Sequence, residues 1–220
     1  MKTIKEITEA LKESTQIEPW MDQIAQDERA GVVKVWTQFQ KRLEKIEALQ
    51  KAHDEKLQFD AGYLPYENAY IAGTDEAGRG PLAGPVVTAA VILPNYCQEL
   101  LGVNDSKLLS KEKRNEYAER IKKHALYYAV HFQSVEEIDR LNIYEATRQS
   151  MLKSIEALEA TPHFILADAM TLPVAIPQAS IIKGDARSLA IAAASILAKT
   201  ARDEYMENLD LQFPEYGFAQ

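Results

Sequence analysis

Acidic side chains stand at the ends of several predicted strands. Asp75 and Glu76 follow the stretch "YIAGT", and Asp168 and Asp185 end "FILAD" and "IIKGD". If these strands are neighbours in one sheet, four carboxylates converge, and such a cluster cannot ionise fully without a cation. Oxygen ligands suit Mg²⁺ or Mn²⁺, and two such ions roughly 3.5–4 Å apart support in-line attack on a phosphodiester. The pattern predicts a two-metal nuclease site whose metal ligands and catalytic residues are Asp75, Glu76, Asp168 and Asp185.

Each acid also has a structural explanation. An Asp–Glu pair before a glycine turn is common in solvated turns, and Asp185 before a helix is explained as its N-cap. Asp168 is hardest to explain in this way, because a charge at the end of an apolar strand needs a partner or a metal. Adjacent side chains on a strand point to opposite faces, so Asp75 and Glu76 share a site only if the strand ends or bends between them.

A glycine-rich turn, "GRGPLAG", follows the first two acids. It lacks the Gly-Lys-Ser/Thr of a Walker loop, and its glycine spacing and following strand differ from a dinucleotide fingerprint. Its backbone N–H groups can meet a phosphate or a sugar once metals neutralise the acids. "NDSK" is explained either as a turn with a cap or as a phosphate contact through Ser106 and Lys107. "KGDARS", from Lys183 to Ser188, places bases at a helix N-terminus, which favours phosphate.

A mixed sheet would bring these residues together. Strands are expected over 70–75, 85–93, 125–133, 163–169 and 179–185, with helices over 110–124, 134–158 and 186–209. The glycine turn suits an antiparallel hairpin of the first two strands. Three antiparallel strands followed by alternating helices and strands are typical of an α/β domain.

Residues 1–65 are predicted to be a helical N-terminal extension, separate from a catalytic domain at 66–220. Apolar residues recur at helical spacing, first Ile4, Ile7 and Leu11, and then Val33, Trp36, Leu43 and Ile46. This pattern indicates an amphipathic hairpin or a small bundle. Residues 59–70 carry Gly62 and Pro65 and are interpreted as a linker or entry segment.

Composition excludes several classes of protein. The 220 residues are 46% hydrophobic and 26% charged, and no apolar run approaches the roughly 20 residues of a membrane span. The start "MKTIKEITEALKES" has no continuous apolar core, so it is not a signal peptide. A single cysteine, Cys97, excludes internal disulfides and a cysteine-based zinc site, and we expect a cytoplasmic location. The net charge of −8 argues weakly against a nucleic-acid binder.

The motifs together resemble bacterial ribonuclease HII, the type 2 ribonuclease H. They are "DEAGRGPLAGPV", "NDSK", "NIYEATRQSM", "DAM" and "IIKGDARSLAIAAASILAK", in that order between about Tyr70 and Gln220. The resemblance implies a ribonuclease H-like mixed five-stranded sheet flanked by helices. It implies Mg²⁺- or Mn²⁺-dependent hydrolysis of RNA in RNA–DNA hybrids, and incision 5′ of single ribonucleotides in duplex DNA. The products would carry 3′-hydroxyl and 5′-phosphate ends, the role would be ribonucleotide removal in DNA replication and repair, and the enzyme is expected to be a monomer.

The resemblance also assigns roles to residues. The four family acids match Asp75, Glu76, Asp168 and Asp185. The backbone of the family's Gly-Arg-Gly turn is expected to contact the ribose 2′-hydroxyl, which distinguishes RNA from DNA; it matches Gly78, Arg79 and Gly80. Further positions are expected near the nucleic-acid backbone, and they are Ser106, Lys107, Lys183 and Ser188.

Two features depart from the family pattern. Family members continue beyond "FPEYGFAQ" into a Gly-Tyr-Gly segment whose tyrosine stacks at the ribonucleotide–DNA junction. This chain is then either C-terminally truncated, which is the interpretation that we favour, or natively short, and we expect weakened activity. The N-terminal extension resembles that of some bacterial members, and we expect it to add substrate affinity. Two alternatives stay open: another metal nuclease of the same fold, and a nucleic-acid-binding module without activity.

Overall fold

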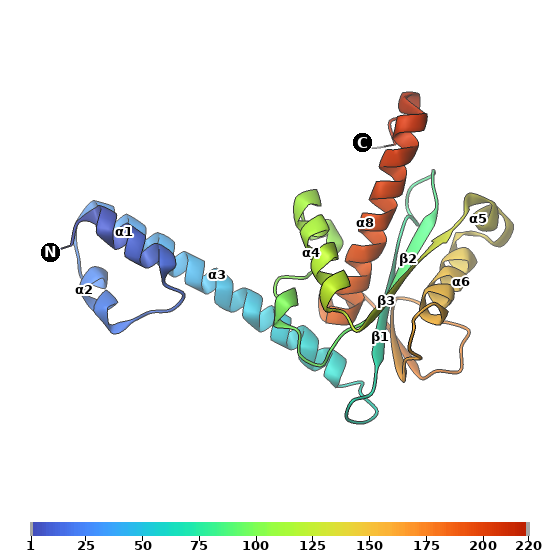
Figure 1. Cartoon of the computed structure of the whole chain (residues 1–220), viewed down its shortest axis with the longest axis horizontal. Coiled ribbons are helices and arrows are strands. Elements are labelled where there is room, and N and C mark those ends of the chain that lie inside the picture. Colours follow the sequence, from blue (N-terminus) through green and yellow to red (C-terminus); the bar gives the residue numbers. More distant parts are fainter. Residues whose placement is uncertain (1, 219–220) are drawn as a thin grey trace. The chain divides into compact units, whose positions relative to one another are not determined.

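The computed structural model describes residues 2–218 and divides at residue 52 into two units, Met1–Ala52 and His53–Gln220. The first unit contains α1 (Ile4–Glu13), α2 (Asp22–Ala25) and the first part of α3 (Ala30–Ala61), drawn in blue in Figure 1. Thr3 caps α1 in a capping box with Glu6. The buried apolar residues of this unit are Ile7, Leu11, Met21, Ile24, Val32, Phe39 and Leu43. The helical prediction is confirmed, but Val33 and Ile46 are exposed and Val32 is buried instead.

The segment 59–70 packs on the second unit's core. Phe59, Tyr63 and Leu64 lie against a buried cluster that includes Ile71 and Leu166. Phe59 also belongs to α3, which continues to Ala61. The interpretation as a linker or entry segment is therefore wrong for residues 59–61, which belong to α3, whereas residues 62–70 have no helix or strand and lead into β1. The predicted domain boundary at residue 65 stays a prediction.

A five-stranded mixed sheet organises the second unit (Figure 1). Its strands are β1 (Ile71–Ala77), β2 (Val86–Ile92), β3 (Tyr127–Gln133), β4 (Phe164–Asp168) and β5 (Gln178–Ile181). The order across the sheet is β3-β2-β1-β4-β5. β1, β2 and β3 pair antiparallel, whereas β4 pairs parallel with both β1 and β5. The predicted mixed sheet is confirmed.

Helices cover both faces of the sheet. On one face lie α4 (Lys111–His124) and α8 (Leu189–Gln212), and on the other lie α5 (Val135–Leu141) and α6 (Ile143–Glu156) (Figure 1). Every residue of β2 is buried between the two layers. β1 approaches α8 closely at Gly73, where an added Cβ would lie 2.2 Å from the carbonyl carbon of Ala190. Glycine on the strand and alanine on the helix therefore set this spacing.

The connection between β4 and β5 contains no helix, so the predicted alternation of helices and strands fails here. Met170 and Leu172 are buried, and Val174 and Ile176 pack beside them on the core under α6. The side chain of Gln178 accepts a hydrogen bond from the main-chain N–H of Leu172 at 2.7 Å and donates one to its carbonyl at 2.9 Å. Alternating apolar residues thus cover the sheet in place of a helix.

The chain turns after β5 earlier than the apolar pattern predicts. The strand ends at Ile181 rather than at Asp185, and Lys183 has a φ of 54° in the left-handed region. A four-residue helix, α7 (Gly184–Arg187), follows and carries Asp185. Across residues 2–218, we find no helix with the length and apolarity that a bilayer span requires.

Candidate active site

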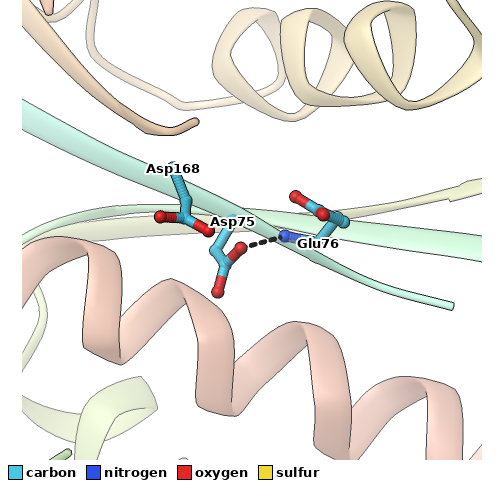
Figure 2. Close-up of side chains that lie close together, drawn as sticks. All are labelled: Asp75, Glu76 and Asp168. Carbon is cyan, nitrogen blue, oxygen red and sulfur yellow. Dashed lines mark hydrogen bonds between the residues drawn. The ribbon is translucent and has the colours of Figure 1, made fainter. Parts of the chain in front are cut away.

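Three acids meet where β1 and β4 run side by side (Figure 2). Their parallel pairing ends at Thr74 and Ala167, immediately before Asp75 and Asp168. One carboxylate oxygen from each of Asp75, Glu76 and Asp168 lies within 4.8 Å of the others. The parallel register therefore brings acids that are far apart in the sequence to one end of the sheet.

Glu76 joins the group although β1 does not end between the two adjacent acids. The strand continues to Ala77, whereas β4 ends beside Asp75, so no further residue of β4 stands next to Glu76. The main-chain N–H of Glu76 donates a 2.7 Å hydrogen bond to Asp75 Oδ1. Arg79 Nη1 lies 3.2 Å from Glu76 Oε1 and partly balances its charge.

Burial and mutual repulsion disfavour the ionised acids. The pKa of Asp75 is raised well above its ordinary value by burial and by the charges of Glu76 and Asp168, against hydrogen bonds from Ser195 and from Glu76. Burial also raises the pKa of Glu76, although Arg79 opposes this. A divalent cation would remove the repulsion and favour the ionised forms.

Asp185 lies beside this group but outside it. The main-chain N–H of Gly184 donates a 2.7 Å hydrogen bond to Asp168 Oδ1, which ties α7 to the end of β4. Asp185 is 9% exposed, and its pKa is raised by burial and by the charges of Asp105 and Asp168. The N-cap explanation for Asp185 is wrong, because Ser188 caps α8 by accepting from Ile191 N–H at 3.1 Å.

The donor set fits a hard divalent cation. All its side-chain donors are carboxylate oxygens, the ligands that Mg²⁺ and Mn²⁺ favour. One of them, Glu76 Oε2, is buried and has no hydrogen-bond partner among residues 2–218. A buried carboxylate oxygen without a partner is costly, and a bound cation would remove that cost.

An open cleft of about 460 Å³ exposes the acids. Of the residues predicted from the sequence, its lining contains Asp75, Glu76, Gly78, Arg79, Gly80, Ser106, Lys107 and Asp168. Ser195, Lys199 and Arg202, all from α8, also line it but were not among the predicted site residues. Asp185, Lys183 and Ser188 are not among the lining residues.

The glycine turn is held against α8 by Arg202. This buried side chain donates from Nε to Pro85 O at 3.1 Å and from Nη2 to Ala83 O at 2.8 Å. Gly78 has a φ of 105°, and an added Cβ would lie 2.4 Å from Arg202 Nε. An added Cβ at Gly80 would have no atom within 4 Å. Packing thus requires glycine at residue 78 but leaves the main chain open at residue 80.

The "NDSK" segment is a capped 3₁₀ turn beside the cleft. Asp105 accepts from Lys107 N–H at 2.8 Å, and the Ser106 hydroxyl is 3.1 Å from that of Ser195. Ser106 is buried, whereas Lys107 is exposed. The turn-and-cap explanation of the "NDSK" segment is therefore confirmed. Lys107 lines the cleft, and its contact with a phosphate stays a prediction.

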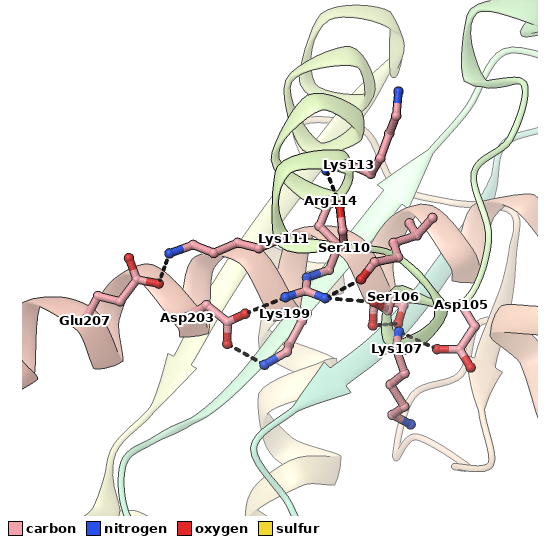
Figure 3. Close-up of polar contacts among 12 residues, drawn as sticks. Asp105, Ser106, Lys107, Ser110, Lys111, Lys113, Arg114, Lys199, Asp203 and Glu207 are labelled. Carbon is pink, nitrogen blue, oxygen red and sulfur yellow. Dashed lines mark hydrogen bonds and ion pairs between the residues drawn. The ribbon is translucent and has the colours of Figure 1, made fainter. Parts of the chain in front are cut away.

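A hydrogen bond and an ion pair of Arg114 connect this turn to α8 (Figure 3). Arg114 of α4 donates to Ser106 O at 3.2 Å and lies 3.3 Å from Asp203. Asp203 also pairs with Lys199 of the cleft. The ion pair with Asp203, one turn along α8, therefore orients Lys199.

Two predicted substrate contacts lie elsewhere. Lys183 is exposed in the turn after β5. Ser188 is fully buried at the start of α8, where it caps the helix. Their contacts with nucleic acid stay predictions, and a buried cap is the role that the structure shows for Ser188.

Comparison with known proteins gives consistent matches over most of the chain. A family model described as ribonuclease HII matches residues 72–220, and one described as the ribonuclease HII N-terminal domain matches residues 3–64. The chain is similar to a ribonuclease HII from Halalkalibacterium halodurans, with 46% identity over 218 residues, 98% of this chain and 82% of that protein.

Two solved structures extend the comparison. The ribonuclease H2 from Pyrococcus horikoshii OT3 matches with a TM-score of 0.61 and 28% identity, over 67% of this chain and 78% of that one. A PCNA:RNase HII complex from Archaeoglobus fulgidus matches with a TM-score of 0.56 and 31% identity, over 65% of this chain and 76% of that one.

Proposed function

Because this chain belongs to the ribonuclease HII family, we propose that it is a metal-dependent endonuclease that hydrolyses the RNA strand of RNA–DNA hybrids. It also incises duplex DNA on the 5′ side of a single ribonucleotide and leaves 3′-hydroxyl and 5′-phosphate ends. Removal of ribonucleotides during DNA replication and repair is the role that follows from this activity.

One observation carries the proposal. The oxygens of Asp75, Glu76 and Asp168 lie within 4.8 Å of one another in a cleft that also contains the glycine turn and two lysines. Three carboxylates alone would repel a phosphodiester, whereas lysines and main-chain N–H groups attract it. A cleft that contains both carboxylates and lysine or main-chain N–H groups fits a phosphodiester substrate that binds together with divalent cations.

Four acids hold the metal in this proposal: Asp75, Glu76, Asp168 and Asp185. Asp75 is the most buried of them and would hold metal together with the other three acids. When bound, two Mg²⁺ or Mn²⁺ ions would neutralise the acids, activate the attacking water and stabilise the leaving 3′-oxygen. The pairing of Arg79 with Glu76 balances one of the charges before the ions bind.

The glycine turn recognises the ribose through its main chain. The open space beside Gly80 supports a close approach of the 2′-hydroxyl, the group that distinguishes RNA from DNA. Lys107 and Lys199 line the cleft and contact phosphates, and Lys183 binds the strand farther along.

The N-terminal helices add affinity for the duplex in this proposal. A chain that begins at His53 should then show a higher KM with kcat little changed, because the acids and their supporting contacts all lie in residues 53–218. An unchanged KM would remove the extension from the substrate-binding surface.

Cleavage of labelled duplexes tests the proposed activity. The chain is incubated with Mg²⁺ or Mn²⁺ and one of three duplexes: an RNA–DNA hybrid, DNA with one ribonucleotide, and all-DNA. The matched variants are Asp75→Asn and Asp139→Asn, since Asp139 is an exposed residue of α5. We expect cleavage of the hybrid and a cut 5′ of the ribonucleotide by the wild type and by Asp139→Asn only.

Other outcomes would contradict the proposal in different ways. Cleavage of the all-DNA duplex would indicate a general nuclease of the same fold. Binding of the hybrid without metal-dependent cleavage would indicate a nucleic-acid-binding module.

A further inference from the structure

A buried lysine, Lys56, lies in the last turns of α3 and is 5% exposed. Its ammonium group donates to Asn104 Oδ1 at 2.8 Å, to the main-chain oxygen of Asp185 at 3.1 Å and to Val103 O at 3.3 Å. A lysine has three N–H donors, so each donor has an acceptor in reach. Lys56 thus joins three segments that are distant in the sequence.

Two of these segments carry parts of the candidate active site. Asp185 belongs to α7, which is tied to Asp168 through Gly184. Asn104 precedes the turn that places Ser106 and Lys107 in the cleft. Lys56 is not a lining residue of that cleft, so it supports the site from behind.

A second residue of α3 supports the same region. Asp60, one turn beyond Lys56, accepts a 3.0 Å hydrogen bond from the main-chain N–H of Ala190 in the first turn of α8. The helix therefore holds the chain just before and just after Ser188. A two-point attachment fixes the orientation of α7 better than one contact would.

Charge complements this geometry. The negative charges of Asp185, Asp105 and Asp60 favour the charged form of Lys56, although burial outweighs them and lowers its pKa to about 8. A buried ion is costly unless its hydrogen bonds are complete. Lys56 meets that condition only in the arrangement that holds Asp185 and Asn104 in place.

We propose that Lys56 is a positioning residue of the metal site, which holds the main chain of Asp185 so that its carboxylate stays beside Asp168. The inference rests on the proposed function, because it takes Asp185 as a metal ligand. It assigns the end of α3 to the framework of the active site rather than to substrate binding.

The direction in which the affinity for a metal ion changes on substitution of Lys56 tests the proposal. Replacing Lys56 with Met removes both a positive charge and the three contacts. Loss of the charge alone would strengthen the binding of a cation. Loss of positioning would weaken it, and supporting residues of this kind are typically worth about 10-fold in affinity or more. Binding of Mn²⁺ alone, measured by titration calorimetry on the full chain, separates the two effects.

The expected result is an approximately tenfold higher Kd for Mn²⁺ in Lys56→Met, with an unchanged Kd in the matched control Lys123→Met, an exposed lysine of α4. Lys56→Arg, which keeps the charge and the donors, should recover most of the affinity. In cleavage of the hybrid, kcat should fall more than KM rises, because the lost contacts position the acids and reach the duplex only through the turn that carries Lys107.

Two further measurements keep the proposal falsifiable. Asp185→Asn serves as a benchmark: if it leaves Mn²⁺ binding unchanged, the proposed metal site itself is wrong. If Asp185→Asn weakens binding but folded Lys56→Met does not, only the role of Lys56 is overturned. Should Lys56→Met lack a cooperative melt, Asn104→Ala removes the shortest contact of Lys56, together with the 3.0 Å hydrogen bond that Asn104 Oδ1 accepts from Asp105 N–H. A smaller loss of Mn²⁺ affinity supports the proposal, and an unchanged affinity overturns it.

Discussion

Replacing Asp75 with Asn should abolish cleavage while making the metal-free protein more stable. The side chain is 5% exposed, and its carboxylate is close to those of Glu76 and Asp168. Asn keeps the size of Asp and one oxygen acceptor, so the main-chain hydrogen bond from Glu76 can persist. The substitution therefore removes the charge with little change in packing.

The repulsion sets the size of the effect. With ligand oxygens within 4.8 Å of one another, each ionised pair repels by roughly 3.5 kcal/mol at an effective dielectric constant of about 20. Proton uptake limits this penalty, because the raised pKa of Asp75 lets the wild type neutralise part of the cluster. We expect a net gain of about 1–2 kcal/mol, which raises Tm by about 2–8 °C for a chain of this size.

The pH dependence has a definite sign. A carboxyl whose folded pKa lies above its unfolded value destabilises the folded state at high pH, and the penalty disappears as the pH falls through the folded pKa. The advantage of Asp75→Asn in EDTA should therefore be largest at mildly alkaline pH and shrink on acidification.

Thermal unfolding in EDTA and in Mn²⁺ is the assay. Wild type should gain stability from Mn²⁺ through linkage, whereas Asp75→Asn should gain little, and Asp139→Asn should follow the wild type in both conditions. A large fall in Tm for Asp75→Asn in EDTA would refute the reasoning, because it would show that the charge of Asp75 stabilises the fold.

Three other expectations follow from the cleft. Gly78→Ala should lower stability by about 1–3 kcal/mol in urea unfolding, because it forces a side chain into a left-handed conformation, whereas Gly80→Ala should leave stability unchanged and reduce cleavage; equal stability losses would contradict this. Arg202→Lys cannot maintain both contacts with the turn, so kcat/KM should fall about tenfold with Mn²⁺ affinity unchanged; an unchanged kcat/KM would count against a positioning role. Mn²⁺ binding should release protons and weaken as the pH falls, because burial raises the pKa of Asp75 and Glu76; calorimetry in two buffers of different ionisation enthalpy measures this, and pH-independent binding would exclude the cluster as the metal site.

Strand ends were the part of the site that the sequence could predict. Asp75 and Asp168 follow apolar stretches whose strand character is clear, and parallel pairing of β1 with β4 brings their carboxylates together. Asp185 was harder to place, because "SIIKG" looks like strand throughout and its turn depends on the left-handed Lys183.

The supporting residues had no signal of their own. Lys56 lies in a helix with many charged neighbours, where a lysine normally faces solvent, and only tertiary contacts show that it is buried. Arg202 is similar, since its partners are main-chain carbonyls more than 100 positions away in the sequence. The helix phase around Val32 was missed for the same reason: a face that is rich in apolar residues does not show which of them another helix covers.

The contact between Gly73 and α8 has a consequence for the heat inactivation of the enzyme. Main-chain atoms set the spacing there, so no rotamer change of a side chain can alter the distance between the strand of Asp75 and the helix that follows Asp185. We therefore expect the acids to keep their arrangement until the contact between β1 and α8 is lost. Heat inactivation and global melting should accordingly be one cooperative event.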